Sequence, residues 1–478
     1  MLRATKIIAT LGPASEKPEV LREMIRAGVD VVRMNFSHGT VADHKARHDL
    51  VRSISAEVGK EVGIMADLQG PKIRVGKFAE NKIQLVEGEQ FILDVACELG
   101  NQERVGLDYK DLPKDVKASD CLLLNDGLIV LRVESVKGGE IFTRIIQGGP
   151  LSNNKGINRA GGGLTAPALT EKDIADLDAA IAMGVDFLAI SFPKDGADMA
   201  YARRLADAAS AKYGVGKVKT IAKVERAEAI VPKALESIIA ESDGIMVARG
   251  DLAIEVGNPA VPALQKRMIK LAIEADKFAI TATQMMESMI SAPVPTRAEV
   301  SDVANAVLDG TDAVMLSAES AAGLYPVQTI KAMAEICLEA EKSDRVQLDT
   351  DFLDKTFTRI DQTIALGALF TAHHLNASAI AALTDSGSTA VWMSRHNIHV
   401  PIFALTSKLA TQRSLSVYRN VFPINLNYTK EREAALREVE ECLKNLGAVE
   451  KGDTVVLTSG EPMGEPGGTN NLKIIHVT

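Results

Sequence analysis

The chain has 478 residues, which is too long for one ordinary domain, so we expect two or three. Hydrophobic residues make up 46% and charged residues 24%, as in ordinary globular proteins. The net charge of −9 and the 4% aromatic content argue against a nucleic-acid binder. No apolar run reaches the length of a membrane span, and the four cysteines form no C-x-x-C pair, so we expect a cytoplasmic protein without membrane contact.

The first 70 residues alternate between expected strands and helices. Apolar runs at 6–12, 31–34 and 63–66 predict strands, and each run ends in polar residues. Between them, apolar residues at helical spacing predict helices, the longer one at about 41–58. From residue 71 to 167 the pattern changes to short alternating strands with glycine-rich turns, which indicates an inserted small all-β barrel domain with hinges at both ends.

The strand–helix alternation returns at residue 168. The runs Thr170 to Asp173 and Thr296 to Glu299 resemble capping boxes, which mark helix starts. Further strands are expected at 187–190, 220–222, 245–248, 279–282 and 313–316. With the first three, they make eight strand–helix units, the number of a closed (β/α)₈ barrel. We therefore expect a TIM barrel over 1–70 and 168–345, an inserted domain over 71–167, and a C-terminal α/β domain with a mostly parallel sheet over 346–478.

Residues directly after the strands of such a barrel form the face that carries active sites. Glu225 and Asp251, after the fifth and sixth strands, are oxygen ligands suited to Mg²⁺, and Lys223 would spread the charge of a transferring phosphoryl group. The run from Arg249 to Asp251 also begins a helix whose backbone N–H groups can take a substrate carboxylate. Taken singly these residues are explained as helix caps, but six of the eight strands end in such groups, so we favour a site. The residues are Arg33, Asn35, Ser37, Asp67, Lys223, Glu225, Asp251, Thr283, Gln284, Ser317 and Glu319.

Long motifs along the chain resemble the pyruvate kinase family. They are TKIIATLGPAS, VVRMNFSHG, ADLQGPKIRVG, SNNKGIN, IAKVERAEAI, MVARGDLAIE, TATQMMESM and the C-terminal GGTNNLKIIHV. The match runs from Thr5 to the C-terminus, and the pattern is closest to the bacterial enzymes. The resemblance implies a glycolytic enzyme that transfers the phosphoryl group of phosphoenolpyruvate to ADP, giving ATP and pyruvate.

The resemblance also implies roles for individual residues. Glu225 and Asp251 correspond to the Mg²⁺ ligands, with Mn²⁺ as an alternative metal, and Lys223 to the lysine that stabilises the phosphoryl group. Thr283 corresponds to a threonine beside the substrate, and Ser317 to a serine of a proton relay. The other implied contacts are Arg33 to the substrate phosphate, Ala248, Arg249 and Gly250 to the substrate, and Asn35, His38, Arg74 and Lys155 to the nucleotide. The inserted domain, which carries Arg74 and Lys155, would act as a lid.

Asn35, Ser37, Asp67 and the Leu68 carbonyl correspond to the family's monovalent-cation site. Potassium-requiring members have a glutamate where this chain has Lys72. An ammonium group beside Asp67 would supply the charge of K⁺ and disfavour a second cation. We therefore hypothesise activity without K⁺, against the alternative that Lys72 is a solvated lysine of the hinge.

Residues 384–389 follow an expected strand of the last domain and begin a helix. Hydroxyl and N–H groups at a helix start can hold a phosphate, and by resemblance this is the allosteric effector loop, which would take a sugar phosphate or a nucleotide. An ordinary strand–helix turn explains the spacing equally well. The loop is Thr384, Asp385, Ser386, Gly387, Ser388 and Thr389, and Ser407, Lys408 and the loop at 464–469 would complete the pocket.

Two other functions fit parts of the pattern. Another Mg²⁺-dependent barrel enzyme acting on phosphoenolpyruvate or an enolate would share the metal carboxylates but needs neither the lid nor the third domain. A catalytically inactive metabolite sensor would not need Lys223, Glu225, Asp251 and Thr283. Members of the family are usually tetrameric, so we expect a homotetramer.

Overall fold

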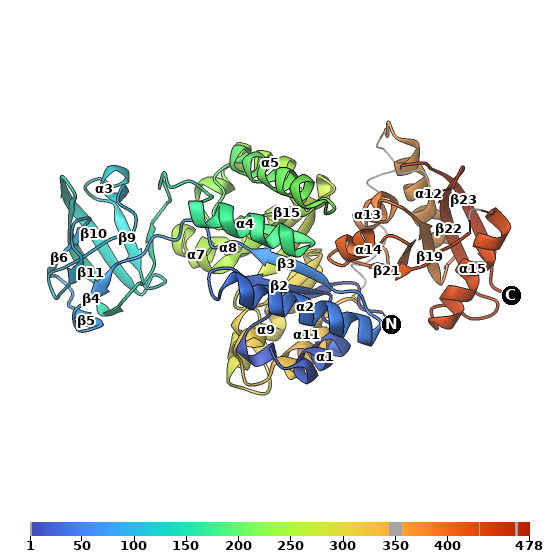
Figure 1. The fold of residues 1–478 in the computed structure, drawn as a ribbon, viewed down its shortest axis with the longest axis horizontal. Coiled ribbons are helices and arrows are strands. Elements are labelled where there is room, and N and C mark those ends of the chain that lie inside the picture. The colour runs from blue at the N-terminus through green and yellow to red at the C-terminus, as the bar shows by residue number, and fades with distance from the viewer. Residues whose placement is uncertain (1, 344–355, 430, 464–466) are drawn as a thin grey trace.

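A computed structural model describes residues 2–343, 356–429, 431–463 and 467–478. Three bodies lie in a row, with the inserted domain and the C-terminal domain at opposite ends of a central barrel (Figure 1). The first described residues lie between the barrel and the C-terminal domain (Figure 1).

Eight parallel strands close into the central barrel, in the order β1-β18-β17-β16-β15-β14-β3-β2. Their residues are almost all buried, as expected for strands covered by helices outside and by packed side chains inside. The predicted (β/α)₈ barrel is confirmed. The strands are β1 (Lys6–Thr10), β2 (Val31–Asn35), β3 (Gly63–Asp67), β14 (Phe187–Ile190), β15 (Lys219–Val224), β16 (Gly244–Ala248), β17 (Phe278–Ala282) and β18 (Ala313–Leu316).

Helices connect the barrel strands, and side-chain caps begin several of them. Thr170 and Thr296 each accept a hydrogen bond from the backbone N–H three residues later, and the acidic residue there bonds back to the threonine, so both predicted capping boxes are confirmed. The α-helices are α1 (Pro18–Ala27), α2 (Val41–Val58), α4 (Glu171–Met183), α5 (Gly196–Tyr213), α6 (Pro232–Glu241), α7 (Arg249–Val256), α8 (Val261–Glu274), α9 (Arg297–Leu308), α10 (Ala318–Ala321) and α11 (Pro326–Ala340). Four 3₁₀ turns accompany them: η1 (Pro13–Ser15), η2 (Glu228–Ile230), η3 (Asn258–Ala260) and η4 (Glu287–Ile290).

The inserted domain, which we call the lid, has its own apolar core and is built almost entirely of strands. A six-stranded sheet has the order β13-β9-β10-β11-β6-β8, and two pairs, β12-β5 and β4-β7, flank it. One short helix, α3 (Leu112–Asp115), interrupts the strands. The strands are β4 (Lys77–Phe78), β5 (Lys82–Leu85), β6 (Gln90–Asp94), β7 (Leu99–Gly100), β8 (Arg104–Val105), β9 (Cys121–Leu124), β10 (Ile129–Lys137), β11 (Glu140–Gln147), β12 (Gly149–Ser152) and β13 (Ile157–Arg159).

The C-terminal domain is a five-stranded sheet with the order β21-β20-β19-β22-β23. Its strands are parallel except β23, which runs antiparallel to β22, so the mostly parallel sheet is confirmed. The expectation of a mostly parallel sheet did not specify this antiparallel edge strand. The elements are β19 (Ala379–Leu383), β20 (Ile402–Thr406), β21 (Val421–Asn425), β22 (Thr454–Gly460), β23 (Thr469–His476), α12 (Ile360–His374), α13 (Ser388–Ser394), α14 (Leu409–Leu415) and α15 (Arg432–Asn445).

The elements group as the three-domain division predicts, while the individual domain boundaries stay predictions. The boundary expected at 345/346 lies outside the described residues. Within the described ranges, no helix combines the length and the apolar character needed to cross a membrane.

Candidate active site

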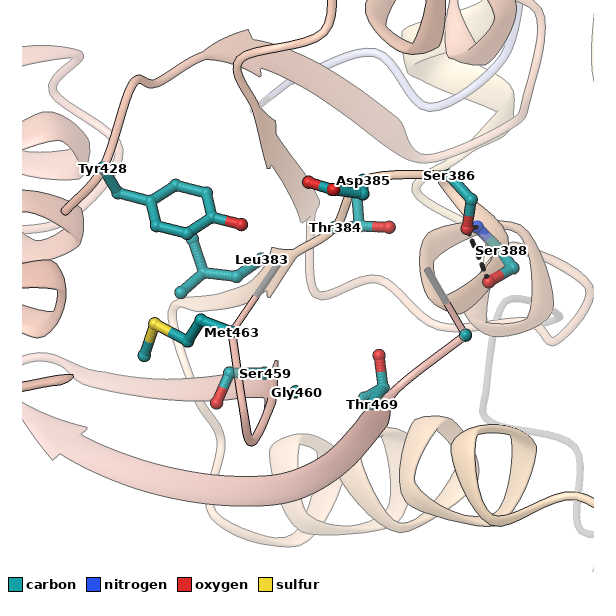
Figure 2. Close-up of a pocket in the computed structure, with 11 residues that line it drawn as sticks. Leu383, Thr384, Asp385, Ser386, Ser388, Tyr428, Ser459, Gly460, Met463 and Thr469 are labelled. Carbon is teal, nitrogen blue, oxygen red and sulfur yellow. Dashed lines mark hydrogen bonds between the residues drawn. The ribbon is translucent and has the colours of Figure 1, made fainter. Parts of the chain in front are cut away.

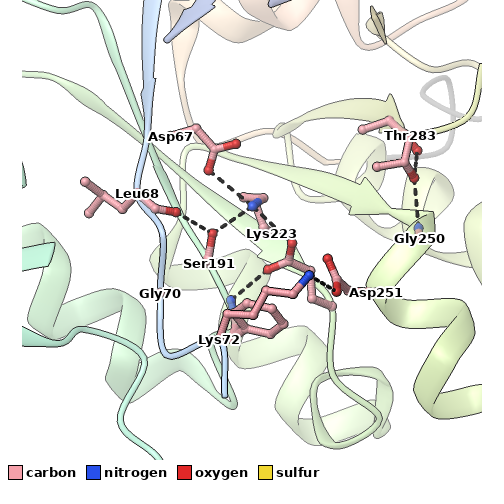
Figure 3. A network of polar contacts seen from close by, with 12 residues as sticks. Asp67, Leu68, Gly70, Lys72, Ser191, Lys223, Gly250, Asp251 and Thr283 are labelled. Carbon is pink, nitrogen blue, oxygen red and sulfur yellow. Dashed lines mark hydrogen bonds and ion pairs between the residues drawn. The ribbon is translucent and has the colours of Figure 1, made fainter. Parts of the chain in front are cut away.

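Lys223 lies at the centre of a polar network at the carboxyl ends of the barrel strands (Figure 3). Its Nζ lies 3.2 Å from Asp67 Oδ1, 3.0 Å from Glu225 Oε1 and 2.7 Å from the Ser191 hydroxyl. Asp67 also pairs through Oδ2 with Arg33 Nε at 2.5 Å. Strands β2, β3, β14 and β15 bring these groups together because parallel strands of a barrel end on the same face.

Burial and neighbouring charges set the protonation of this network. Burial would raise the pKa of Asp67, but the cations of Arg33 and Lys223 outweigh it and lower that pKa. Burial would lower the pKa of Lys223, but Asp67 and Glu225 outweigh it and raise that pKa. The pKa of Glu225 is raised to about 7, first by burial and then, against the pull of Lys223, by the carboxylates of Asp251 and Asp67. Burial and the neighbouring carboxylates thus disfavour the charged form of Glu225, and an added cation would favour that form.

Asp251, in the first turn of α7, accepts a hydrogen bond at 3.0 Å from Lys72 Nζ (Figure 3). We expected the Lys72 ammonium beside Asp67, and the structure corrects this. Asp67 is fully buried and is already paired with Arg33 and Lys223, whereas Lys72 and Asp251 are 27% and 24% exposed. The network thus balances three cations, Arg33, Lys72 and Lys223, against three carboxylates, Asp67, Glu225 and Asp251.

Glu225 and Asp251 form a donor set that fits Mg²⁺. Both are carboxylates, the pKa of Glu225 is raised by its burial and by the neighbouring carboxylates, and Asp251 lines an open cavity. Among the described residues, no group of three or more His, Cys, Asp or Glu side chains is arranged to hold a metal ion. An ion held by this pair would therefore take its other ligands from substrate and water, as Mg²⁺ commonly does.

The start of α7 is held against the end of β17. The Gly250 N–H donates to the Thr283 hydroxyl at 2.8 Å, and Arg249 donates to the Thr283 carbonyl at 2.7 Å and to Asp302 at 2.7 Å. Thr283 has a φ of +69°, which is strained for a β-branched residue and typical of functional sites. Because the Gly250 N–H already has a partner, a substrate carboxylate would have to compete with Thr283 for it.

A cavity of about 640 Å³ opens between the barrel mouth and the lid. Its lining includes Lys72 of the hinge and Asp251, Thr283 and Ser317 of the barrel, which are site residues predicted from the sequence. Glu319 also lines it and joins two loops, because it accepts hydrogen bonds from the backbone N–H groups of Ser317 at 2.7 Å and of Met286 at 3.2 Å. The lid side is formed by Leu123, Asp126 and Gly127.

The expected nucleotide contacts of the lid do not line this cavity. Arg74 lines a different one, of about 520 Å³, and its guanidinium donates to the Asn154 carbonyl at 3.0 Å. Lys155 is likewise absent from the residues that line the cavity at the barrel mouth. The lid extends away from the barrel (Figure 1), so these groups would approach the site only if the lid moved.

The fourth barrel strand contributes two groups that we did not predict. Ser191, directly after β14, accepts from Lys223 and donates to the Leu68 carbonyl at 2.7 Å, and the Phe192 N–H donates to Glu225 at 3.0 Å. Their position after a strand was the available signal, but neither side chain is charged. At the end of β2, the Asn35 side chain accepts from the Ser37 N–H at 3.1 Å, and the His38 N–H donates to the Asn35 carbonyl at 3.2 Å.

The expected effector loop lies between β19 and α13 (Figure 2). Its polar groups bond to one another: the Thr384 hydroxyl accepts from the Gly387 N–H at 2.8 Å, and the Ser386 and Ser388 hydroxyls lie 3.1 Å apart. Lys408 pairs with Asp385 at 2.9 Å. The cavity here is only about 20 Å³, so a sugar phosphate would require the loop to move. The loop at 464–469 was also expected to complete the pocket, but its residues 464–466 lie outside the described residues.

A closed barrel that gathers a buried lysine, an arginine and two carboxylates suited to Mg²⁺ at its mouth is the arrangement expected of an enzyme of metal-assisted phosphoryl transfer. Comparison with known proteins makes this specific. The family model described as "Pyruvate kinase, barrel domain" matches residues 2–330, and that described as "Pyruvate kinase, alpha/beta domain" matches 362–475. The chain belongs to the pyruvate kinase family.

Individual relatives agree over their full lengths. The chain is 49% identical over 480 residues to pyruvate kinase II of Salmonella typhimurium, covering 100% of this chain and 99% of that protein. It is 50% identical over 463 residues to the pyruvate kinase of Haemophilus influenzae, covering 96% of each. A crystal structure of a pyruvate kinase from Cryptosporidium parvum superposes with a TM-score of 0.92 at 33% identity, covering 100% of this chain and 96% of that one. The expected family and its bacterial type are thereby confirmed.

Proposed function

We propose that this chain transfers the phosphoryl group of phosphoenolpyruvate to ADP and protonates the resulting enolate to pyruvate. The observation that carries the proposal is the placement of Lys223 between Asp67 and Glu225, beside a cavity that Asp251 lines. The rival barrel enzyme acting on an enolate is not favoured, because the relatives that match over the full length are pyruvate kinases.

Glu225 and Asp251 would hold the Mg²⁺ that the family uses, or Mn²⁺ in its place. When bound there, the ion supplies positive charge to the phosphoryl oxygens and the substrate carboxylate. Lys223 donates to the phosphoryl group in transfer and is kept protonated by Asp67 and Glu225, which raise its pKa. Arg33 pairs with Asp67 and presents its remaining N–H groups to the substrate phosphate.

The other end of the substrate faces α7 and β17. Gly250, together with the flanking Ala248, Arg249 and Asp251, receives the carboxylate at the helix start once the Thr283 hydroxyl turns away from the Gly250 N–H. Thr283 then faces the carbon that is protonated, and Ser317, which lines the same cavity, passes the proton.

ADP binding would require the lid to close. Arg74 and Lys155 lie on the lid side, and Asn35 and His38 lie at the end of β2 and in the turn after it, so the two sets would clamp the nucleotide phosphates from opposite sides. Closure would also exclude water, which otherwise competes with ADP for the phosphoryl group.

Lys72 makes K⁺ dispensable in this proposal. Its ammonium neutralises Asp251 at 3.0 Å, so the three carboxylates of the network are matched by protein cations alone. The Asn35, Ser37, Asp67 and Leu68 oxygens would then not need a monovalent ion, because Asp67 is paired with Arg33 and Lys223 and the Leu68 carbonyl accepts from Ser191.

Regulation and assembly follow the family in this proposal. The loop at 384–389, with Ser407 and Lys408, would open to take a phosphorylated metabolite or a nucleotide, and Lys408 would leave Asp385 for the phosphate. Assembly as a homotetramer stays a prediction, which sedimentation would test.

A coupled assay of pyruvate formation tests the function. With phosphoenolpyruvate and Mg²⁺, we expect pyruvate only when ADP is added, and none when Mg²⁺ is chelated. Pyruvate formed at the same rate without ADP would favour a lyase or phosphatase and contradict the proposal.

A further inference from the structure

The returning hinge strand of the lid is fastened to the barrel by groups that directly follow the two Mg²⁺-type carboxylates. This strand leaves the lid at β13 and re-enters the barrel at residue 168. Arg226 donates to the Leu164 carbonyl at 3.0 Å and to the Ala166 carbonyl at 3.3 Å, and Glu228 accepts from the Gly163 N–H. Both side chains come from the segment that begins at Glu225.

Glu255 joins this segment to α7. Its Oε2 accepts from the Ala227 N–H at 2.8 Å, and its side chain interacts with that of Asn158 in β13, which packs against α7. Its own carbonyl accepts from the Gly161 N–H at 3.0 Å. Glu255 thus contacts both the segment after Glu225 and the lid, and its helix, α7, also carries Asp251.

The spacing within α7 places Asp251 and Glu255 on the same side of the helix. Asp251 and Glu255 are four residues apart, so they lie on one face of the helix. Asp251 contacts Lys72, on the outgoing hinge strand, and Glu255 contacts Asn158, on the returning one. A rotation or shift of α7 therefore moves the metal-binding carboxylate and both attachments of the lid together.

Three consecutive glycines allow the returning hinge strand to bend between its contacts with Glu255 and Arg226. Gly161, Gly162 and Gly163 have φ values of +78°, +75° and +93°, a region that other residues adopt only with strain. A Cβ on Gly162 would lie 2.4 Å from Glu228, so the carboxylate packs where only glycine fits. The glycines thus give the backbone of this strand conformational freedom. Glu255 holds the strand before the glycine run, and Glu228 and Arg226 hold it at the end of the run and just after it.

Glu255 is only 7% exposed, and burial raises the pKa of its carboxyl to about 7. An acidic side chain is costly in such a place unless its acceptor oxygens are needed. We propose that Glu255 is a positioning residue for the transfer to ADP: it ties the returning lid strand to the segments that carry Glu225 and Asp251. The inference rests on the proposed function, because it supposes that the lid brings the nucleotide to the site.

The test compares Glu255→Ala and Glu255→Gln with Glu341→Ala. Glu341 is the matched control, because its carboxylate also holds backbone N–H groups, those of Ala4 at 2.9 Å and Thr5 at 2.8 Å, but far from the lid. We expect Glu255→Ala to lose roughly 10- to 100-fold in kcat/KM for ADP, with the KM for phosphoenolpyruvate almost unchanged. Glu255→Gln keeps an acceptor for the Ala227 N–H and should recover most of the loss.

Wild-type turnover is measured first, so that failure of the proposed function is separated from failure of this inference. If the wild type is active and Glu255→Ala matches Glu341→Ala in kcat/KM for ADP, the inference is wrong. It is also wrong if the loss falls equally on both substrates and follows the drop in melting temperature.

Asn158→Ala provides an outcome that does not depend on a stable Glu255 variant. It removes the lid side of the contact and leaves the Ala227 bond to Glu255 in place. We expect a raised KM for ADP and an unchanged apparent affinity for Mg²⁺. An unchanged KM for ADP would overturn the inference.

Discussion

Replacing Lys72 with glutamate reverses a charge that lies 3.0 Å from Asp251. In the wild type, three cations balance three carboxylates, a net charge of 3 − 3 = 0. In Lys72→Glu, two cations face four carboxylates, a net charge of 2 − 4 = −2. The negative site would then repel an anionic substrate, and its surplus negative charge would favour the binding of a monovalent cation.

The size of the effect follows from distance and exposure. Two unit charges about 4 Å apart interact by about 4 kcal/mol at an effective dielectric constant of about 20. The Lys72 and Asp251 side chains are 27% and 24% exposed, so the energy of this pair should be closer to that of a surface ion pair. Because surface pairs are worth about 1 kcal/mol or less, we take about 2 kcal/mol for the reversal, or about 30-fold in turnover.

The assay measures initial rates in buffers free of Na⁺ and K⁺, with an organic cation holding ionic strength constant. We expect the wild type to be active and almost indifferent to added K⁺. Lys72→Glu should lose about 30-fold without K⁺ and recover most of that on K⁺ addition. Lys82→Glu makes the same charge change on the exposed lid strand β5 and should acquire no K⁺ requirement. A wild type that collapses without K⁺, or a Lys72→Glu variant that remains fully active without it, would refute the role of Lys72.

Two further predictions concern the effector loop and the stability of the lid attachment. Ser386→Glu places a carboxylate among the loop hydroxyls, so we expect it to abolish the thermal shift that sugar phosphates or nucleotides cause in the wild type; a retained shift would locate the effector elsewhere. The pKa of Glu255 rises from 4.5 to about 7, mainly because of burial, so the folded state holds a proton that the unfolded state releases. This stabilisation is complete below pH 4.5 and is lost as pH rises through about 7. The free energy of unfolding of the wild type should therefore fall by about 3 kcal/mol relative to Glu255→Gln over that range, and parallel urea-denaturation profiles would contradict the assignment.

The barrel and much of its site were predictable because their signals are local. Each strand is a buried apolar run, and the residue after it must lie at the barrel mouth, which was enough to bring Arg33, Asp67, Lys223 and Glu225 together. Ser191 follows the same rule, but a single serine after a strand is indistinguishable from an ordinary turn residue.

What the sequence could not predict depends on contacts between distant segments. Lys72 pairs with Asp251, which is 179 positions away, and only the folded chain brings the two together. In the sequence, Glu255 is an ordinary polar residue of a short helix. Its contacts with Asn158 and Ala227 become apparent only in the structure. The antiparallel strand β23 was missed because its residues alternate weakly and it occupies a sheet edge.

Turnover by Lys223→Met tests the central claim most directly. The substitution keeps an unbranched side chain but removes the ammonium that lies between Asp67 and Glu225. Lys219→Met, on the same strand, is the control, since Lys219 contacts Tyr418 at the opposite end of β15. We predict a loss of about a thousandfold in kcat for Lys223→Met, with phosphoenolpyruvate and Mg²⁺ still bound, and a near-normal rate for Lys219→Met. A Lys223→Met enzyme that turns over at the rate of the control would contradict the account.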